Sequence, residues 1–385
     1  MIPLGSFAAL LVVALGYGTI VPLAPTLLQE SMGRMSVETL SLHTGALSAV
    51  YLLTFAALAP VWGRAADVRS RHTIAAGGLV GFAASFAVIA VIRRVDVLYA
   101  GLAIAGACAA AVVPAVQVQV ARVEGDPARA RVLAALGAAS FTGWFLGPPL
   151  ASWSIARVTV AGIPADRFSL GIVALLGLAA AMLARSSARP GLSEKASSAG
   201  PEPSTALGRD AWIFGLLAMA VTFGIGGFEV SLVLWVVQVL RLDAALVSRM
   251  LVECTVVMMI VQVLIFLLPA ARPRWNPPAA GMALVAMAAA IAAVPLAGGG
   301  WIGFAAVAVI AITATLLQMM ISLGTVASAR SRAGAALGLQ LSLSSVGQGV
   351  GSFAAGALFS ASGGGFFVSA ALVAAMGAWA FTLRK

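Results

Sequence analysis

Two acidic residues lie inside long apolar runs of the sequence. Glu229 falls in AVTFGIGGFEVSLVLWVVQVL and Glu253 in SRMLVECTVVMMIVQ. An ionised carboxylate in the middle of a lipid-embedded helix costs roughly 2.5–3.5 kcal/mol on insertion scales, so such a residue faces a wet cavity, finds a partner or takes up a proton. Arg249 lies four residues before Glu253, so an ion pair on one helix face would explain that acid. Glu229 has no basic neighbour within a turn, and we interpret it as the leading proton-coupling residue.

Both acids also have plainer interpretations. Glu229 could form a structural hydrogen bond to another helix, and Glu253 could belong to an interfacial ion pair with no coupling role. We expect further cavity residues among the polar and aromatic side chains in the middle of apolar runs, although single Trp and Gln residues also lie at interfaces or join helices. These candidates are Tyr17, Tyr51, Trp144, Gln262 and Gln318.

Sulfur-containing side chains recur at four-residue spacing in the run that holds Glu253. Met250, Cys254 and Met258 would share one helix face, and soft sulfur ligands suit Cu(I). More often such residues only fill space in a core. No Cys/His spacing typical of a structural metal site occurs, so no resident metal or cofactor is expected.

Composition decides which elements position these residues. Of 385 residues, 61% are hydrophobic and only 9% charged, with a mean hydropathy of +1.05. Soluble domains carry roughly 25% charged residues, so both a soluble fold and a disordered chain are excluded. Apolar runs of 18 or more residues exclude the alternating strands of a barrel. An all-α membrane protein with twelve spans follows, with helices near 4–25, 44–62, 73–92, 96–121, 131–155, 168–185, 211–239, 245–268, 279–297, 301–326, 334–360 and 364–383.

Charge and polarity indicate the orientation and the domains. Most of the 23 basic residues fall in loops on the side of both termini, so the positive-inside rule predicts cytoplasmic termini in an inner membrane. The basic residues lie singly between apolar runs, which excludes a nucleic-acid surface despite the net charge of +10. Residues 186–210, rich in Ser, Pro and Gly, are expected to link an N-terminal six-helix bundle (1–185) to a C-terminal one (211–385).

An internal duplication supports two pseudo-symmetric bundles. The segments that begin at Arg131 and Ala335 carry small residues at one constant offset along the chain. Each segment opens the fifth helix of its half, as two repeated bundles require. The matching residues are Ser140, Gly143, Gly147 and Ala151 in the first segment and Ser344, Gly347, Gly351 and Ala355 in the second.

The loop GRAADVRSRH resembles a signature of the major facilitator superfamily. Gly63, Asp67 and Arg71 match that family's pattern, whereas Ser70 replaces a Gly and His72 a second basic residue. Gly63 would let two helix ends approach closely, and Asp67 could accept hydrogen bonds from Arg71 and from a neighbouring helix N-terminus. The resemblance implies a cytoplasmic latch in the outward-open state. An ordinary positive-inside loop is the plainer alternative.

The fifth helix resembles the exporter motif of the same superfamily. Gly143, Gly147 and Pro148 match its core, although small residues at this spacing also serve plain helix packing. The first helix, with ALGYGTIVPLAP, is similar to that of the twelve-span drug:proton antiporters. It departs from them at Val13, where those exporters often have an acid, and an apolar residue near Leu102 replaces their Arg.

Together these features predict a secondary transporter and not an enzyme. We expect proton-coupled efflux of a small amphiphilic or cationic molecule by alternating access, performed by a monomer in the lipid bilayer. The rival interpretation is a proton-coupled importer of a metabolite or of a metal ion such as copper. No phosphate-binding loop of the Gly-rich Lys-Ser/Thr type occurs, which disfavours ATP as the energy source.

Overall fold

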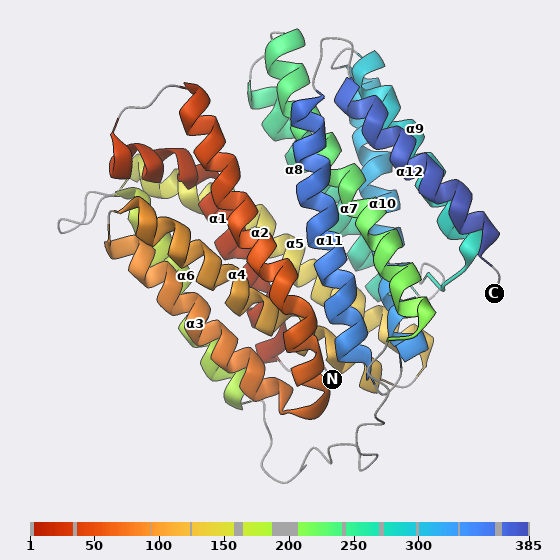
Figure 1. Ribbon diagram of the computed structural model, residues 1–385, viewed down its shortest axis with the longest axis horizontal. Helices are drawn as coiled ribbons and strands as arrows, with labels where there is room; N and C mark the ends of the chain where they lie inside the picture. Colours follow the sequence, from red (N-terminus) through yellow and green to blue (C-terminus); the bar gives the residue numbers. More distant parts are fainter. Residues whose placement is uncertain are drawn as a thin grey trace. The chain divides into compact units, whose positions relative to one another are not determined.

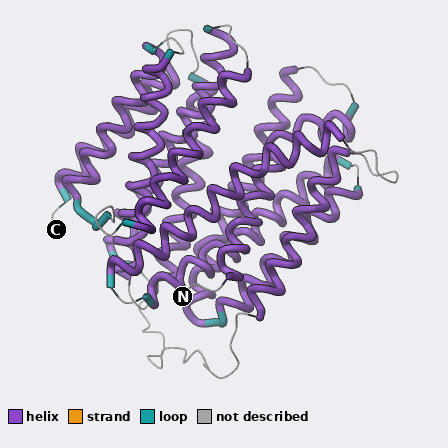
Figure 2. The backbone as a smooth tube through the Cα atoms, turned by 180° about the vertical axis from the view of Figure 1, so that it is seen from behind, coloured by secondary structure: helices purple, strands orange, loops and turns teal. Residues whose placement is uncertain are grey.

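The structure is a computed structural model in which the chain is described at residues 4–33, 37–92, 94–123, 125–157, 165–186, 207–240, 244–268, 273–297, 300–329, 332–358 and 364–383. Within these ranges it forms twelve long helices and no strand (Figures 1 and 2), which confirms the all-α prediction. The helices are α1 (Leu4–Met32), α2 (Val37–Val68), α3 (Arg71–Val91), α4 (Val95–Gln117), α5 (Asp126–Arg157), α6 (Ala165–Ser186), α7 (Arg209–Leu234), α8 (Ala244–Leu267), α9 (Pro277–Ala293), α10 (Trp301–Ala329), α11 (Ala333–Ala357) and α12 (Gly364–Thr382). Shorter helical segments are η1 (Val118–Arg122), η2 (Trp235–Val239) and η4 (Val294–Leu296).

Several helices extend beyond the ends that the sequence predicted. The first was expected to end at Pro25, but α1 continues to Met32. The second was expected to begin at residue 44, whereas α2 begins at Val37 and passes through Pro60. Proline and charge were poor markers of these ends, because helices in a membrane tolerate proline where neighbouring groups satisfy the freed backbone.

Helix α11 differs in polarity from its neighbours. Over the described residues, nine helices are long and apolar enough to cross a membrane, and α1 and α8 contribute shorter apolar stretches. Helix α11 is in neither group, because its sequence AGAALGLQLSLSSVGQGVGSFAAGA is rich in Gly, Ser and Gln. A polar helix in such a protein is tolerated where it faces other helices or water and not lipid.

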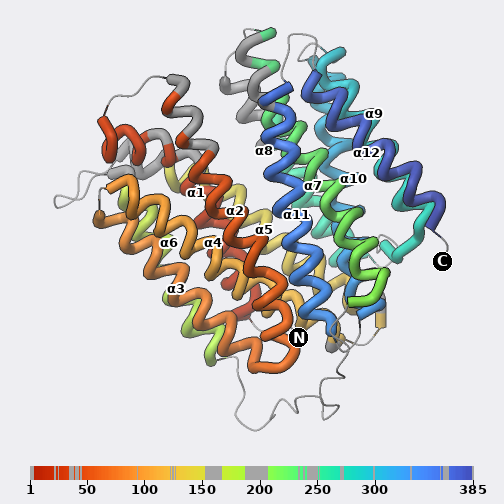
Figure 3. Tube along the Cα trace, in the orientation of Figure 1, coloured from red at the N-terminus to blue at the C-terminus, as the bar shows by residue number. Residues whose placement is uncertain are grey.

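The chain divides into two compact units. Unit 1 comprises Met1–Arg122, Ala135–Ala206 and Ser331–Gly338; unit 2 comprises Val123–Ala134, Leu207–Arg330 and Leu339–Lys385. Within unit 1, α3 packs beside α4 and α6, and within unit 2, α9 packs beside α10 and α12 (Figure 3). The start of α11 thus belongs to unit 1 and the start of α5 to unit 2. Most of the predicted linker, residues 187–206, lies outside the described residues.

Glycine residues bring α1 and α5 into backbone contact in unit 1. A methyl group on Gly143 would overlap the carbonyl oxygen of Leu11, and one on Gly147 would overlap the backbone of Gly18. Gly18 in turn packs on the backbone of Trp144. Small side chains allow this close approach, and the dispersion contacts that result are a main source of helix association in lipid.

Unit 2 contains an equivalent contact between α7 and α11. Methyl groups on Gly347 and Gly351 would overlap the carbonyl oxygens of Met219 and Phe223. One on Gly226 would overlap the carbonyl oxygen of Gln348. The glycines that the sequence matched between the two halves therefore perform the same packing task in each unit, as the predicted duplication requires.

An ion pair between a buried arginine and a partly exposed glutamate joins three helices of unit 1. Arg167 of α6 is only 2% exposed, and its Nε and Nη2 atoms donate to Oε2 of Glu30 on α1 at 3.1 and 3.0 Å. Its Nη1 donates to the carbonyl oxygen of Ile89 on α3 at 3.3 Å. The sequence did not predict this pair, which fixes the ends of α1, α3 and α6 together.

Substitution of Gly147 by Val should destabilise the protein, because the added methyl groups cannot fit against Gly18. Overpacking typically costs about 1–3 kcal/mol. Gly171→Val is the matched control, because a Cβ at this position of α6 meets nothing within 4 Å. Thermal unfolding in detergent measures both variants. Equal melting temperatures would contradict the packing contact.

Substitution of Arg167 by Met should cost stability because it leaves Glu30 without its ion-pair partner. Hydrogen bonds to a charged group contribute about 1.5–3 kcal/mol. The double variant Glu30→Gln/Arg167→Met removes both charges and should recover part of the loss in thermal unfolding. If the single and double variants unfold at the same temperature, the pair has no such role.

Candidate functional site

Three of the predicted cavity residues form an aromatic cluster in unit 1. Tyr17 of α1 lies between Tyr51 of α2 and Trp144 of α5, with ring centroids 4.7 and 5.4 Å apart and both pairs tilted. The α1–α5 glycine contact holds Trp144 beside Tyr17, because Gly18 packs on the Trp144 backbone. Trp144 is 38% exposed, whereas Tyr51 is buried. Such rings can stack on a planar ligand or hold a cation over their faces.

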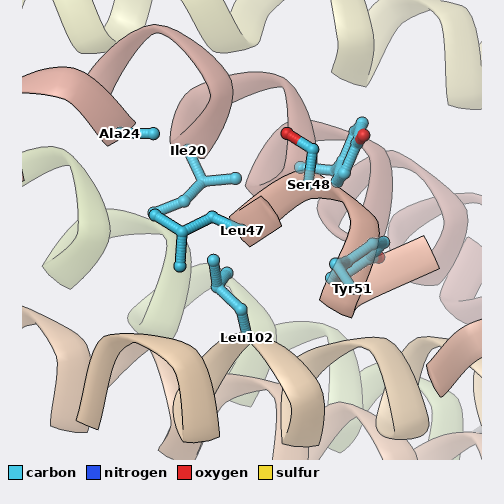
Figure 4. Close-up of a pocket in the computed structure, with 7 residues that line it drawn as sticks. Ile20, Ala24, Leu47, Ser48, Tyr51 and Leu102 are labelled. Carbon is cyan, nitrogen blue, oxygen red and sulfur yellow. The ribbon is translucent and has the colours of Figure 1, made fainter. Parts of the chain in front are cut away.

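A small cavity adjoins this cluster. It has a volume of about 10 Å³ and is lined by Tyr17 and Tyr51 together with Ser48 and apolar side chains such as Leu47 and Leu102 (Figure 4). This is close to the minimum volume that holds one water molecule, which also needs polar partners. The tyrosine and serine hydroxyl groups provide such partners inside an otherwise apolar region.

Glu229 lies at the contact between α7 and α11 in unit 2. Its carboxyl group shares a hydrogen bond with the side chain of Gln348. One turn earlier on α7, Gly226 packs directly on the Gln348 carbonyl, so backbone contact sets the position of the two side chains. The structure therefore gives Glu229 an uncharged polar partner on the most polar helix of the unit.

Helix α8 brings a second acid and a thiol to the same region. The Cys254 thiol lies close enough to interact electrostatically with the carboxyl groups of Glu229 and Glu253. Oε2 of Glu253 is buried and, over the described residues, has no hydrogen-bond partner. The side chain of Arg249 lies outside the described residues, so its ion pair with Glu253 stays a prediction.

The two glutamines that the sequence singled out lie on separate helices of unit 2. Gln262 of α8 is 7% exposed, and its Oε1 atom has no hydrogen-bond partner among the described residues. Gln318 lies partly buried on α10. Buried amide oxygens are normally satisfied, so Gln262 is a reasonable contact for water or a ligand.

The motif expected in a loop lies mostly in helices, with Gly63 and Asp67 at the end of α2 and Arg71 at the start of α3. It forms a defined contact in unit 1. Oδ1 of Asp67 accepts from the Gly334 N–H at 2.8 Å, and Oδ2 accepts from the Ala335 N–H at 2.9 Å. These are among the first N–H groups of α11, where the helix dipole favours an anion. Arg332 adds an attractive charge close to the carboxylate. The sequence had predicted that Asp67 would accept from a helix N-terminus.

Glycines make this contact possible. Methyl groups on Gly63 and Gly338 would overlap the carbonyl oxygens of Gly334 and Ala59. The third motif residue, Arg71, begins α3, and its Nε and Nη1 atoms are buried. In the exporter-like motif, Gly143 and Gly147 form the α1–α5 contact, while Pro148 lies exposed within α5.

Sequence reasoning missed the partners of the predicted residues. Gln348 was not singled out, although it stands in the second half where Trp144 stands in the first. Arg332, the residue near Asp67, was counted only as a loop charge. Within the described ranges, no three His, Cys, Asp or Glu side chains converge on a point that could hold a metal ion. A metal interpretation therefore depends on the sulfur stripe of Met250, Cys254 and Met258.

Comparisons with known proteins agree with this architecture. The sequence profile of the Major Facilitator Superfamily matches residues 6–352. The chain is 33% identical over 145 residues to a class G tetracycline resistance protein of Vibrio anguillarum, covering 37% of this chain and 36% of that protein. It is 38% identical over 98 residues to a triacylglyceride transporter of Mycolicibacterium hassiacum, covering 26% and 18%. The chain thus matches about a third or less of the length of these relatives.

A solved structure extends the likeness to the whole fold. The crystal structure of a human organic anion transporter superposes with a TM-score of 0.79. The match covers 98% of each chain at 18% sequence identity. At this identity the likeness concerns the fold alone.

Substitution of Asp67 by Asn should loosen the start of α11, because the charge that binds two N–H groups is removed. Hydrogen bonds to a charged group contribute about 1.5–3 kcal/mol, so exchange of the Gly334 and Ala335 amides should accelerate at least about tenfold. Hydrogen–deuterium exchange with mass spectrometry measures this. Asp96→Asn is the control, because Asp96 is exposed and pairs only locally with Arg94. Unchanged exchange in Asp67→Asn would contradict the contact.

Proposed function

This chain belongs to the Major Facilitator Superfamily, and from that membership we propose that it exports a small amphiphilic or cationic molecule in exchange for protons. The chain is a multi-pass membrane transporter, not an enzyme. Export, proton coupling and the kind of substrate are the parts that we propose. The proposed location is the inner membrane, with both termini in the cytoplasm.

The position of Glu229 is the observation that carries the proposal. A carboxyl group inside a membrane-spanning helix is costly when ionised, and such residues mark proton relays and substrate paths. Its partner Gln348 is neutral and can donate to a carboxylate or accept from a carboxylic acid. Both protonation states of Glu229 can therefore keep a hydrogen bond. A residue that must gain and lose a proton in each cycle needs this property.

Glu253 gives Glu229 a possible relay partner. The Cys254 thiol lies close to both carboxyl groups, so the two acids share one region of unit 2. Each carboxyl group is costly when ionised inside a membrane-spanning helix, so each can take up a proton. We infer that the pair exchanges a proton with water when the transporter changes state.

The aromatic cluster supports an amphiphilic or cationic substrate. Tyr17, Tyr51 and Trp144 offer ring faces for a cation or a planar molecule, and Trp144 is exposed enough to meet one. The names of the two relatives mention tetracycline resistance and triacylglyceride transport. We infer a substrate of similar polarity.

The contact of Asp67 with α11 supports alternating access. The carboxylate binds the start of a helix from the second half of the chain. We infer that this contact holds the cytoplasmic side closed in the outward-open state. It would break when the transporter opens inward.

Glu229→Gln should reduce proton-coupled transport at least about tenfold, because an amide cannot take up or release a proton. Inverted membrane vesicles with an acidic lumen, treated with tetracycline or the lipophilic cation ethidium as probes, measure this as probe-triggered proton release. Asp210→Asn, in the exposed first turn of the same helix, is the matched control and should transport normally.

Retention of full, pH-sensitive transport by Glu229→Gln would reject the coupling role. Thermal unfolding of the purified variant should match the unsubstituted protein, which separates lost coupling from lost folding. Proton movement in the opposite sense on addition of a metabolite or of Cu(I) would favour import. The sulfur-containing side chains of Met250, Cys254 and Met258 are the feature that supports the hypothesis of a copper importer.

A further inference from the structure

A groove on unit 1 lies beside the motif that holds Asp67. It has a volume of about 460 Å³, within the roughly 300–1,000 Å³ typical of small-molecule pockets. Helix α2 forms one wall through Leu58 and Trp62, and α3 forms the other. Helix α4, which packs against both, forms the floor through residues such as Cys108. Exposed positions of α3 line it, so the groove is open at the surface.

The groove changes polarity along its length. Arg69, Ser70 and Thr73 line one end, where α2 has ended and α3 begins. Beyond them the lining consists of apolar and small residues of α2, α3 and α4. No acidic residue contributes to the lining, since the nearest one in sequence, Asp67, binds the start of α11. The groove therefore has one positively charged end with hydrogen-bond donors, and the rest of it is an apolar channel.

The dimensions match one leaflet of a bilayer. From Ser70 to Gly78, both in the lining, a helix rises about 12 Å at 1.5 Å per residue. One leaflet contributes about half of the roughly 30 Å hydrocarbon thickness. Trp62 lines the same wall, seven residues before Arg69.

We propose that this groove binds one anionic phospholipid, with its phosphate at Arg69, Ser70 and Thr73 and an acyl chain along Leu58, Gly77 and Cys108. Arginine binds phosphate oxygens in a bidentate manner, and the hydroxyl groups of Ser70 and Thr73 supply further donors. The positive end of the α3 dipole adds to the attraction at the same place. The apolar channel accepts a hydrocarbon chain, which a free phosphate ion would leave empty.

The bound lipid would lie behind the Asp67 contact. Trp62 faces the groove, whereas its neighbour Gly63 packs against Gly334 at the start of α11. Likewise Leu58 faces the groove while Ala59 meets Gly338. The end of α2 thus separates the lipid from the start of α11, and an occupied groove would support α2 in the position that this contact requires.

Native mass spectrometry of the full-length protein in detergent tests the site with phosphatidylglycerol and phosphatidylcholine as probes. The unsubstituted protein should bind phosphatidylglycerol more tightly. Arg69→Gln should reduce this preference about fivefold, the effect expected of one basic residue near an anionic surface. Gly77→Phe should abolish binding of both lipids at this site, because its ring fills the channel.

Two matched controls separate the groove from general effects. Arg64→Gln removes an exposed arginine of α2, five residues before Arg69, that does not line the groove. Gly171→Phe adds the same bulk to another unit 1 helix, and a Cβ at Gly77 or Gly171 meets nothing within 4 Å. Both controls should bind as the unsubstituted protein does, and all four variants should keep its melting temperature.

Three results would overturn the proposal. Equal binding of the two lipids, unaffected by Arg69→Gln, would mean that the groove takes any apolar chain. Displacement of phosphatidylglycerol by inorganic phosphate alone would indicate a free-anion site. Unchanged binding in Gly77→Phe would place the lipid elsewhere on the protein. Each result tests only lipid binding in the groove. The proposed transport function and the role of Glu229 are not measured and would be unaffected by these results.

Discussion

A hydrocarbon solvent neither hydrogen-bonds nor stabilises charge, and this constraint explains most of what is distinctive in the structure. Three sites among the described residues illustrate it. Arg167 and Glu30 neutralise each other where three helix ends meet. Asp67 binds the positive end of α11. Among the described residues, the hydrogen-bond partner of Glu229 is the neutral amide of Gln348. Proton exchange is our proposed reason for an acid at this place in the membrane.

The same glycine packing carries different chemistry in the two units. In unit 1 the contact of Gly18 with Trp144 places an aromatic ring beside Tyr17. In unit 2 the equivalent contact of Gly226 with Gln348 places an amide beside Glu229. Duplication therefore preserved the backbone contact, which tolerates no side chain, while the adjoining side chains diverged. We propose that the side chains of one unit bind an amphiphile and that those of the other hold a proton.

The helical architecture could be predicted from the sequence because long apolar runs have few alternatives in lipid. Gly143 and Gly147 were identifiable because their spacing repeats at Gly347 and Gly351. Helix ends were less accurate, as α1 shows by continuing past Pro25. The partners Gln348 and Arg332 were missed because a single polar residue in a sequence does not reveal which helix it meets. The pair of Glu30 and Arg167 was missed for the same reason, since 137 positions separate its members. The lipid groove depends on three helices at once and has no sequence signature.

The central claim is that Glu229 exchanges a proton, and infrared spectroscopy tests it without knowledge of the substrate. The difference between spectra of the unsubstituted protein and Glu229→Gln, recorded in lipid while the pH is varied, isolates the carboxylic-acid C=O band of this residue. The account predicts a band that is present at low pH and disappears reversibly within the pH range in which the transporter works. A Glu229 that keeps one protonation state throughout that range would contradict the claim and leave the acid a purely structural role.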